Sequence, residues 1–271
     1  MGRQEWTEEK LFFRLLNNKS DSTYWDNIRV LRRRPTTHVF EKCILLTHSK
    51  DKKARKVGID VLAQLGETPR PFYTATNKRF FELLNTEKDP EVLMALLYAI
   101  GHNNDSLTRP QIDKLCEFEY SDNALIREGL VNALLGVDNT RAIDTLIKLS
   151  TDKLNHIRDW ATFGLGSQVE RDNWKIREAL WNRVSDKHKD TKAEAIVGLA
   201  LRKDDRVKEI ILRELLSGDH GTLLFEAIIA VEGKEFLPIL KRQLRNEVAG
   251  KEGDRDWIDR LKNCIAELTK L

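Results

Sequence analysis

The chain has 271 residues, of which 41% are hydrophobic and 33% are charged, with only 6 prolines and 14 glycines. The frequent Leu, Ala, Glu, Lys and Arg favour long helices, and because no apolar run approaches ~18 residues, a membrane-spanning protein is excluded. The net charge of +3 is uneven: residues 1–80 hold 17 Lys and Arg against 9 Asp and Glu, and the remainder holds 29 against 34. A solvated surface is the simpler interpretation of the basic end, and an anion site is the alternative.

A helical pattern recurs along the chain at intervals of 31 to 38 residues. In its two clearest copies, which contain Arg127 and Arg158, the arginine is followed by an apolar residue at +3, Ala or Gly at +6 and Leu at +7. Offsets of 3, 6 and 7 share one helix face, and the small residues allow close approach of a neighbouring helix. Matching zero positions are Tyr24, Arg55, Leu93, Arg127, Arg158, Lys192, Leu224 and Ile258.

A second apolar helical pattern precedes each of the later copies, at residues 80–84, 112–118, 143–149, 176–184, 207–216 and 236–248. One repeat is therefore two helices, and Ser or Asp residues suited to a helix start separate them. Self-similarity of this period indicates a solenoid. The sequence predicts an all-α fold, an α-α superhelix of about seven to eight helical hairpins. We expect one domain, 1–271, with approximate repeats 5–34, 36–66, 72–103, 110–137, 140–168, 173–202, 205–233 and 235–271.

The pattern resembles the HEAT repeat family, especially the short bacterial PBS-lyase HEAT-like repeats. The resemblance depends on Ile126-Arg127…Ala133-Leu134 and Ile157-Arg158-Asp159-Trp160-Ala161…Gly164-Leu165-Gly166. It implies an armadillo-like solenoid that binds other macromolecules. It also implies that the position-zero arginine pairs with an acidic residue near an inter-helix turn, which joins adjacent repeats. The family arginine is absent at Leu93 and Leu224, so a continuous arginine ladder is not expected.

Motifs that carry catalysis or bind cofactors are absent from the sequence. It has no G-x-S-x-G, no Walker-type glycine loop, no Cys-x-x-Cys and no HExxH, and its six histidines are expected to be solvated turn residues. The three cysteines, Cys43, Cys116 and Cys264, lie far apart in helical patterns, which is typical of reduced thiols in a cytoplasmic protein. The N-terminus shows no apolar signal region. We therefore expect no enzyme, no cofactor and no metal.

Positions +1 and +5 of each second helix point away from the core face, because each residue turns the helix by about 100°. They are expected to line the concave side, and their Trp, Met, Tyr and Phe content is typical of a protein interface. The predicted protein-binding residues are Trp25, Arg29, Met94, Tyr98, Glu128, Asn132, Asp159, Phe163, Phe225 and Ile229, and Lys56, Asp60, Ala193 and Val197 occupy equivalent positions. The alternative is that curvature of the superhelix buries these side chains between repeats.

The leading hypothesis is a non-catalytic, monomeric scaffold that binds a protein or peptide on its concave face. A narrower version is an immunity protein that neutralises a bacterial toxin, because some HEAT-like proteins of this size resemble such partners. A DNA-alkylation-repair-like glycosylase or DNA-binding protein is an alternative suggested by Arg127 and Arg158-Asp159-Trp160. The net acidic C-terminal two thirds argue against nucleic acid as a partner. A bilin lyase-like activity ranks last, because fold alone does not assign function.

Overall fold

The computed structural model describes residues 2–249 and 254–271, and these residues contain α-helices and short 3-10 or π segments but no strand. The chain divides into two compact units, with the boundary between Val137 and Asp138. In the described residues no helix is both long and apolar enough to span a bilayer. The predicted all-α fold is confirmed, and the prediction of one continuous domain over 1–271 stays a prediction.

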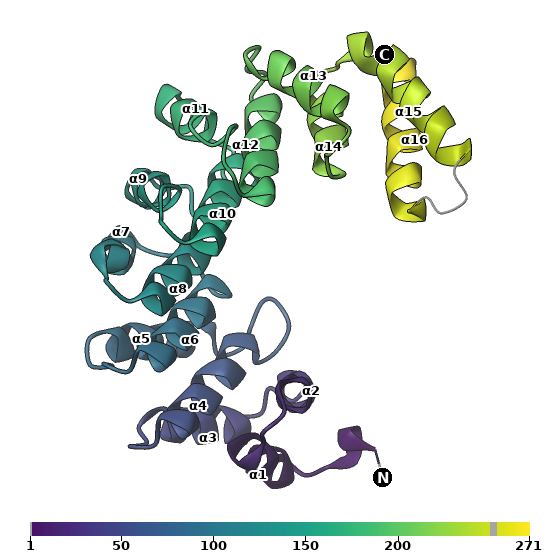
Figure 1. Cartoon of the computed structure of the whole chain (residues 1–271). Coiled ribbons are helices and arrows are strands. Elements are labelled where there is room, and N and C mark those ends of the chain that lie inside the picture. Colours follow the sequence, from purple (N-terminus) through teal and green to yellow (C-terminus); the bar gives the residue numbers. More distant parts are fainter. Residues whose placement is uncertain (1, 250–253) are drawn as a thin grey trace. The chain divides into compact units, whose positions relative to one another are not determined.

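The first unit contains four successive helix pairs. Each first helix packs on the helix that follows it, and the second helices also pack on one another in order. In Figure 1, α5 and α7 lie on one side of α6 and α8. The elements are η1 (Arg3–Glu5), α1 (Glu8–Asn17), α2 (Asp21–Arg32), α3 (Thr37–Thr47), α4 (Lys52–Gln64), α5 (Tyr73–Leu84), α6 (Pro90–Gly101), α7 (Arg109–Cys116), η2 (Glu117–Tyr120) and α8 (Ala124–Leu134).

The second unit repeats this arrangement, and its second helices α10, α12, α14 and α16 again pack in order. Its elements are α9 (Thr140–Leu149), α10 (Asn155–Phe163), the π-helical η3 (Gly164–Gln168), α11 (Trp174–Trp181), α12 (Lys189–Leu201), α13 (Val207–Ser217), α14 (Leu223–Ala230), η4 (Lys234–Phe236), α15 (Leu237–Ala249) and α16 (Arg255–Lys270).

Polar side chains begin the second helices. Asp51 accepts a hydrogen bond from the Lys53 amide at the start of α4, and Asp89 accepts from Glu91 and Val92 at the start of α6. These bonds satisfy amides that have no partner within the helix. The cap of α12 is His188, which accepts from the Thr191 amide. This half-buried histidine therefore has a structural contact that its sequence position did not predict.

Two position-zero arginines join successive repeats. Arg55 donates to both carboxylate oxygens of Glu87 at 2.6 and 3.1 Å, and Arg158 donates to both oxygens of Asp186 at 2.7 and 2.9 Å. Each arginine also donates to a carbonyl six residues earlier in its own repeat. Both therefore have the structural role that the HEAT resemblance implies.

Glycines allow close packing where the sequence placed small residues. A Cβ added to Gly58 of α4 would lie 2.7 Å from the Cys43 carbonyl oxygen of α3. A Cβ added to Gly198 of α12 would lie 2.5 Å from the Cα of Gly166 in η3. Since neither backbone neighbour can move aside cheaply, both helices require glycine at these contacts.

Arg202, a buried arginine, binds backbone carbonyls of the π-helical segment η3 and of the residue that follows it. Arg202 follows α12, is 9% exposed, and donates to the carbonyls of Leu165, Gly166 and Val169 at 2.8, 2.9 and 2.6 Å. These carbonyls lie where the helical ladder ends, so the guanidinium supplies the donors that the irregular backbone lacks.

Candidate protein-binding groove

Three second helices of the first unit line a pair of hollows. One is about 210 Å³ and lies over α2, α4 and α6, and the other is about 510 Å³ and extends to the loop before α2. Both hollows are lined by Trp25, Lys56 and Asp60. We call the two together the groove, defined by Lys19, Tyr24, Trp25, Lys56, Asp60, Met94 and Tyr98.

The repeat positions explain why these side chains gather. Trp25 is the +1 residue of α2, Lys56 and Asp60 are +1 and +5 of α4, and Met94 and Tyr98 are +1 and +5 of α6. Because the three helices pack in order, equivalent positions face the same hollow. Trp25 is 44% exposed, whereas Met94 and Tyr98 are half-buried. The structure therefore brings three of the predicted binding residues together.

Hydrogen bonds fix the two tyrosines of the groove, Tyr24 and Tyr98. The Tyr24 hydroxyl donates to Asp60 Oδ2 at 2.7 Å, and the Tyr98 hydroxyl donates to Glu128 Oε1 at 2.9 Å. Burial raises the pKa of Asp60 to about 6, although the bond from Tyr24 and the charge of Lys56 oppose this increase. Burial and Glu128 also raise the pKa of Tyr98 above its ordinary value, so its hydroxyl remains a donor at neutral pH.

Lysines surround the larger hollow. Lys52 forms a 3.1 Å salt bridge with Glu91, and Lys53 donates to the Asn18 carbonyl at 2.8 Å. Lys19 and Lys56 also line it, and among the residues that the structure describes neither forms a salt bridge. Their ammonium groups remain available to a bound carboxylate.

Other predicted residues of the first unit lie outside the hollows. Arg29 is exposed on α2 and pairs with Asp26 at 2.8 Å. Glu128 and Asn132 are half-buried on α8, where Asn132 donates to the Glu128 carbonyl at 3.0 Å. The Glu128 carboxylate also accepts the hydrogen bond from the Tyr98 hydroxyl.

In the second unit, Asp159 and Phe163 are half-buried on α10, and Ile229 is half-buried on α14. Phe163 packs edge-on against Trp160 with ring centroids 5.5 Å apart, and Trp160 is 43% exposed. These side chains remain partly accessible, and their role in binding stays a prediction.

Phe225 is a correction, because its side chain is 2% exposed and cannot lie on an open surface. Its ring is covered by His220, with centroids 5.5 Å apart, and by Trp257 of α16, with centroids 5.2 Å apart. Val197, which occupies an equivalent position on α12, is also buried, at 4% exposed. At these two positions the neighbouring elements cover the +1 and +5 face, as the alternative interpretation of the sequence proposed.

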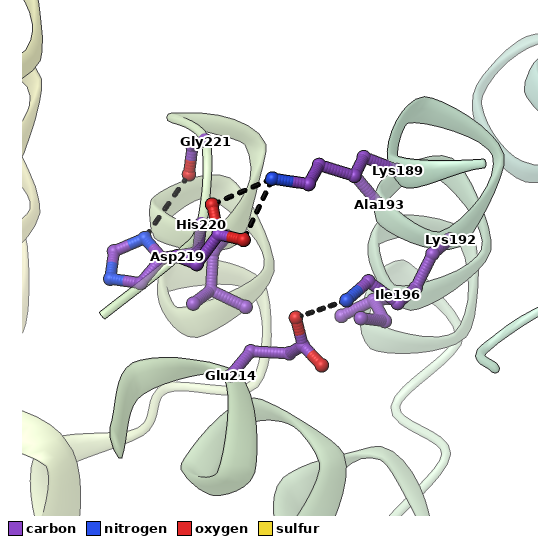
Figure 2. Close-up of a pocket in the computed structure, with 9 residues that line it drawn as sticks. Lys189, Lys192, Ala193, Ile196, Glu214, Asp219, His220 and Gly221 are labelled. Carbon is purple, nitrogen blue, oxygen red and sulfur yellow. Dashed lines mark hydrogen bonds and ion pairs between the residues drawn. The ribbon is translucent and has the colours of Figure 1, made fainter. Parts of the chain in front are cut away.

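The second unit has a smaller hollow of about 70 Å³ at the start of α14 (Figure 2). Figure 2 shows Lys189 directed toward Asp219 and Lys192 toward Glu214, at 2.7 and 2.5 Å. Since these charges pair across the hollow, they join α12 to the following repeat. Lys192 occupies position zero here, so a lysine stands where Arg55, Arg127 and Arg158 stand in their repeats.

The paired helices and their packed second helices define an all-α helical repeat protein. The chain is 25% identical over 241 residues to Protein YibA of Escherichia coli (strain K12), in an alignment that covers 86% of this chain and 83% of YibA. The X-ray structure of E. coli YibA superimposes with a TM-score of 0.74 and 22% identity over 99% of this chain and 94% of that chain. An engineered protein superimposes with a TM-score of 0.52 and 14% identity, covering 94% of this chain and 77% of its own. No family model matches, so the structures support the repeat fold and HEAT membership stays a resemblance.

Proposed function

We propose that this protein is a non-catalytic, HEAT-like scaffold that binds a segment of another protein in the groove. The observation that carries the proposal is Trp25, an exposed tryptophan that shares a hollow with Met94 and Tyr98. Trp, Tyr and Met are enriched where proteins meet, and a few aromatic side chains often supply most of the binding energy.

The groove is ordered before a partner arrives. The bond from Tyr98 to Glu128 holds one ring, and Trp25 packs edge-on against Tyr24, whose hydroxyl is bound to Asp60. A partner therefore orders few side chains on binding, which reduces the entropy cost. Lys19 and Lys56 favour a segment that carries carboxylates, in agreement with the basic character of residues 1–80.

We propose a cytoplasmic location for this interaction. Cys43 and Cys264 are free and buried, and burial raises the pKa of the Cys43 thiol and brings that of Cys264 to about 12. Thiols of this kind are unreactive and are typical of a reducing compartment.

The test is affinity capture with the full chain as bait and mass spectrometry as readout. The double substitution Trp25→Ala and Tyr98→Ala is expected to reduce recovery of the specific partner at least tenfold. The matched control is Trp174→Ala, which removes a tryptophan that is 72% exposed on α11 of the second unit. Full recovery by a double variant whose circular dichroism matches the wild type would exclude the groove as the binding surface.

A further inference from the structure

Three side chains with metal-binding atoms converge in the second unit. Asp159 lies on α10, His188 caps α12, and Asp190 lies in the first turn of α12. One ligand atom from each lies within 4.8 Å of the others. Asp159 Oδ1 is 4.0 Å from His188 Nδ1, and Asp190 Oδ2 is 3.9 Å from His188 Nε2.

A buried threonine connects two of these side chains. Thr191 is 0% exposed, and its hydroxyl lies 3.1 Å from His188 Nδ1 and 3.4 Å from Asp159 Oδ1. In the helix cap Nδ1 accepts from the Thr191 amide at 3.4 Å. When a metal occupies Nε2, the imidazole proton moves to Nδ1, which then donates to the Thr191 hydroxyl in place of that bond. Metal-binding histidines are usually oriented by such a second hydrogen bond from the other ring nitrogen.

The charges around the cluster favour a cation. Asp159 is half-buried, and among the described residues it forms no ion pair with a lysine or arginine. The adjacent Arg158 is instead bound to Asp186 through both carboxylate oxygens. Asp190 adds a further negative charge close to Asp159. A dication would reduce this repulsion.

We propose that Asp159, His188 and Asp190 bind a divalent transition metal of the zinc class, with water completing the coordination. One imidazole nitrogen and two carboxylate oxygens form a donor set that suits zinc better than calcium, which takes six to eight oxygen ligands. The ion would link α10 to the start of α12 and stabilise their packing. The site contains no groove residue and does not depend on the proposed function.

The experiment is calorimetric titration of the untagged, chelator-treated full chain with ZnCl2. We expect one bound ion, and at least about tenfold weaker binding by His188→Asn and by Asp159→Asn. Asparagine can still cap α12, so His188→Asn removes the imidazole while keeping the helix start. Thr191→Val is expected to weaken binding about tenfold through loss of the orienting hydroxyl.

The matched control is His38→Ala. His38 Nε2 also lies near two carboxylates, at 3.9 Å from Glu8 and 3.5 Å from Glu9, but it is 62% exposed and lies outside the cluster. This variant should bind zinc like the wild type. Absence of zinc binding by the wild-type chain, equal affinity in His188→Asn, or an equal loss in His38→Ala would each overturn the proposal. A zinc-dependent rise in the thermal midpoint that His188→Asn abolishes would support it.

Discussion

The guanidinium of Arg158 holds the Asp186 carboxylate at 2.7 Å across a sequence distance of 28 residues. The two side chains are only 11% and 6% exposed, so the pair is shielded from water on both sides. Burial alone would raise the pKa of Asp186, but the bonds from Arg158 and from the His188 amide lower it below its ordinary value. The carboxylate is therefore ionised at neutral pH and matches the arginine.

Removing this arginine should destabilise the chain strongly. Arg158→Met leaves a buried carboxylate without its main partner, which costs roughly 3–5 kcal/mol. The free energy of unfolding in urea, followed by circular dichroism, measures the effect. Lys189→Met removes one partner of the exposed pair with Asp219 and should cost much less, because water and salt screen that pair. Equal losses in the two variants would contradict the structural role of Arg158.

The close contact between α12 and η3 predicts a second loss of stability. Gly198→Ala would place a methyl group 2.5 Å from the Gly166 backbone, and the strain should cost about 1–3 kcal/mol. Gly221→Ala is the control, because nothing lies within 4 Å of its added methyl group. The difference in thermal midpoint between the two variants checks the prediction, and no difference would show that the helices can separate without cost.

The raised pKa of Asp60 predicts that the free energy of unfolding depends on pH. Burial raises its folded-state pKa from an ordinary value of 3.8 to about 6, so the protonated form fits the fold better and stability is lost as pH rises from about 4 through 6. In the Asp60→Asn variant the side-chain amide oxygen would still accept the Tyr24 hydroxyl, but the side chain cannot ionise. Asp60→Asn should therefore stabilise the chain at pH 7.5 by roughly 1–2 kcal/mol, since the carboxylate remains partly solvated, and by almost nothing at pH 4. Urea unfolding at both pH values measures this, and a gain of equal size at pH 4 would contradict the assignment.

The burial of Phe225 predicts that its truncation lowers the stability of the chain, as expected of a core residue. Phe225→Ala removes a fully buried ring and should cost about 3–5 kcal/mol, whereas Phe163→Ala removes a half-buried ring and should cost less. The thermal midpoints of the two variants provide the measurement. A Phe225→Ala variant as stable as the wild type would restore the prediction that its ring faces solvent.

The spacing of apolar and small residues was sufficient to predict the helix pairs and part of the groove. Trp25, Met94 and Tyr98 could be grouped because each lies at +1 or +5 of a second helix, and stacked helices bring equivalent positions together. The burial of Phe225 could not be predicted in this way, because the covering ring of Trp257 comes 32 residues later and belongs to a less regular repeat.

The cluster in the second unit was missed for a related reason. His188 and Asp190 follow Asp159 by 29 and 31 residues, and no short-range histidine motif indicates that they meet. Only the packing of α10 on α12 brings the three side chains together and places the Thr191 hydroxyl beside His188 Nδ1. The one signal in the sequence was that His188 recurs at the repeat position of His220 and lies two residues before Asp190.

Trp257 of α16 shields the Phe225 ring from solvent. A fragment ending before α16 would leave the Phe225 ring against water, close in the same helix to the partly accessible Ile229. An exposed apolar patch of this kind favours aggregation, so a fragment without α16 should be less soluble than the intact chain.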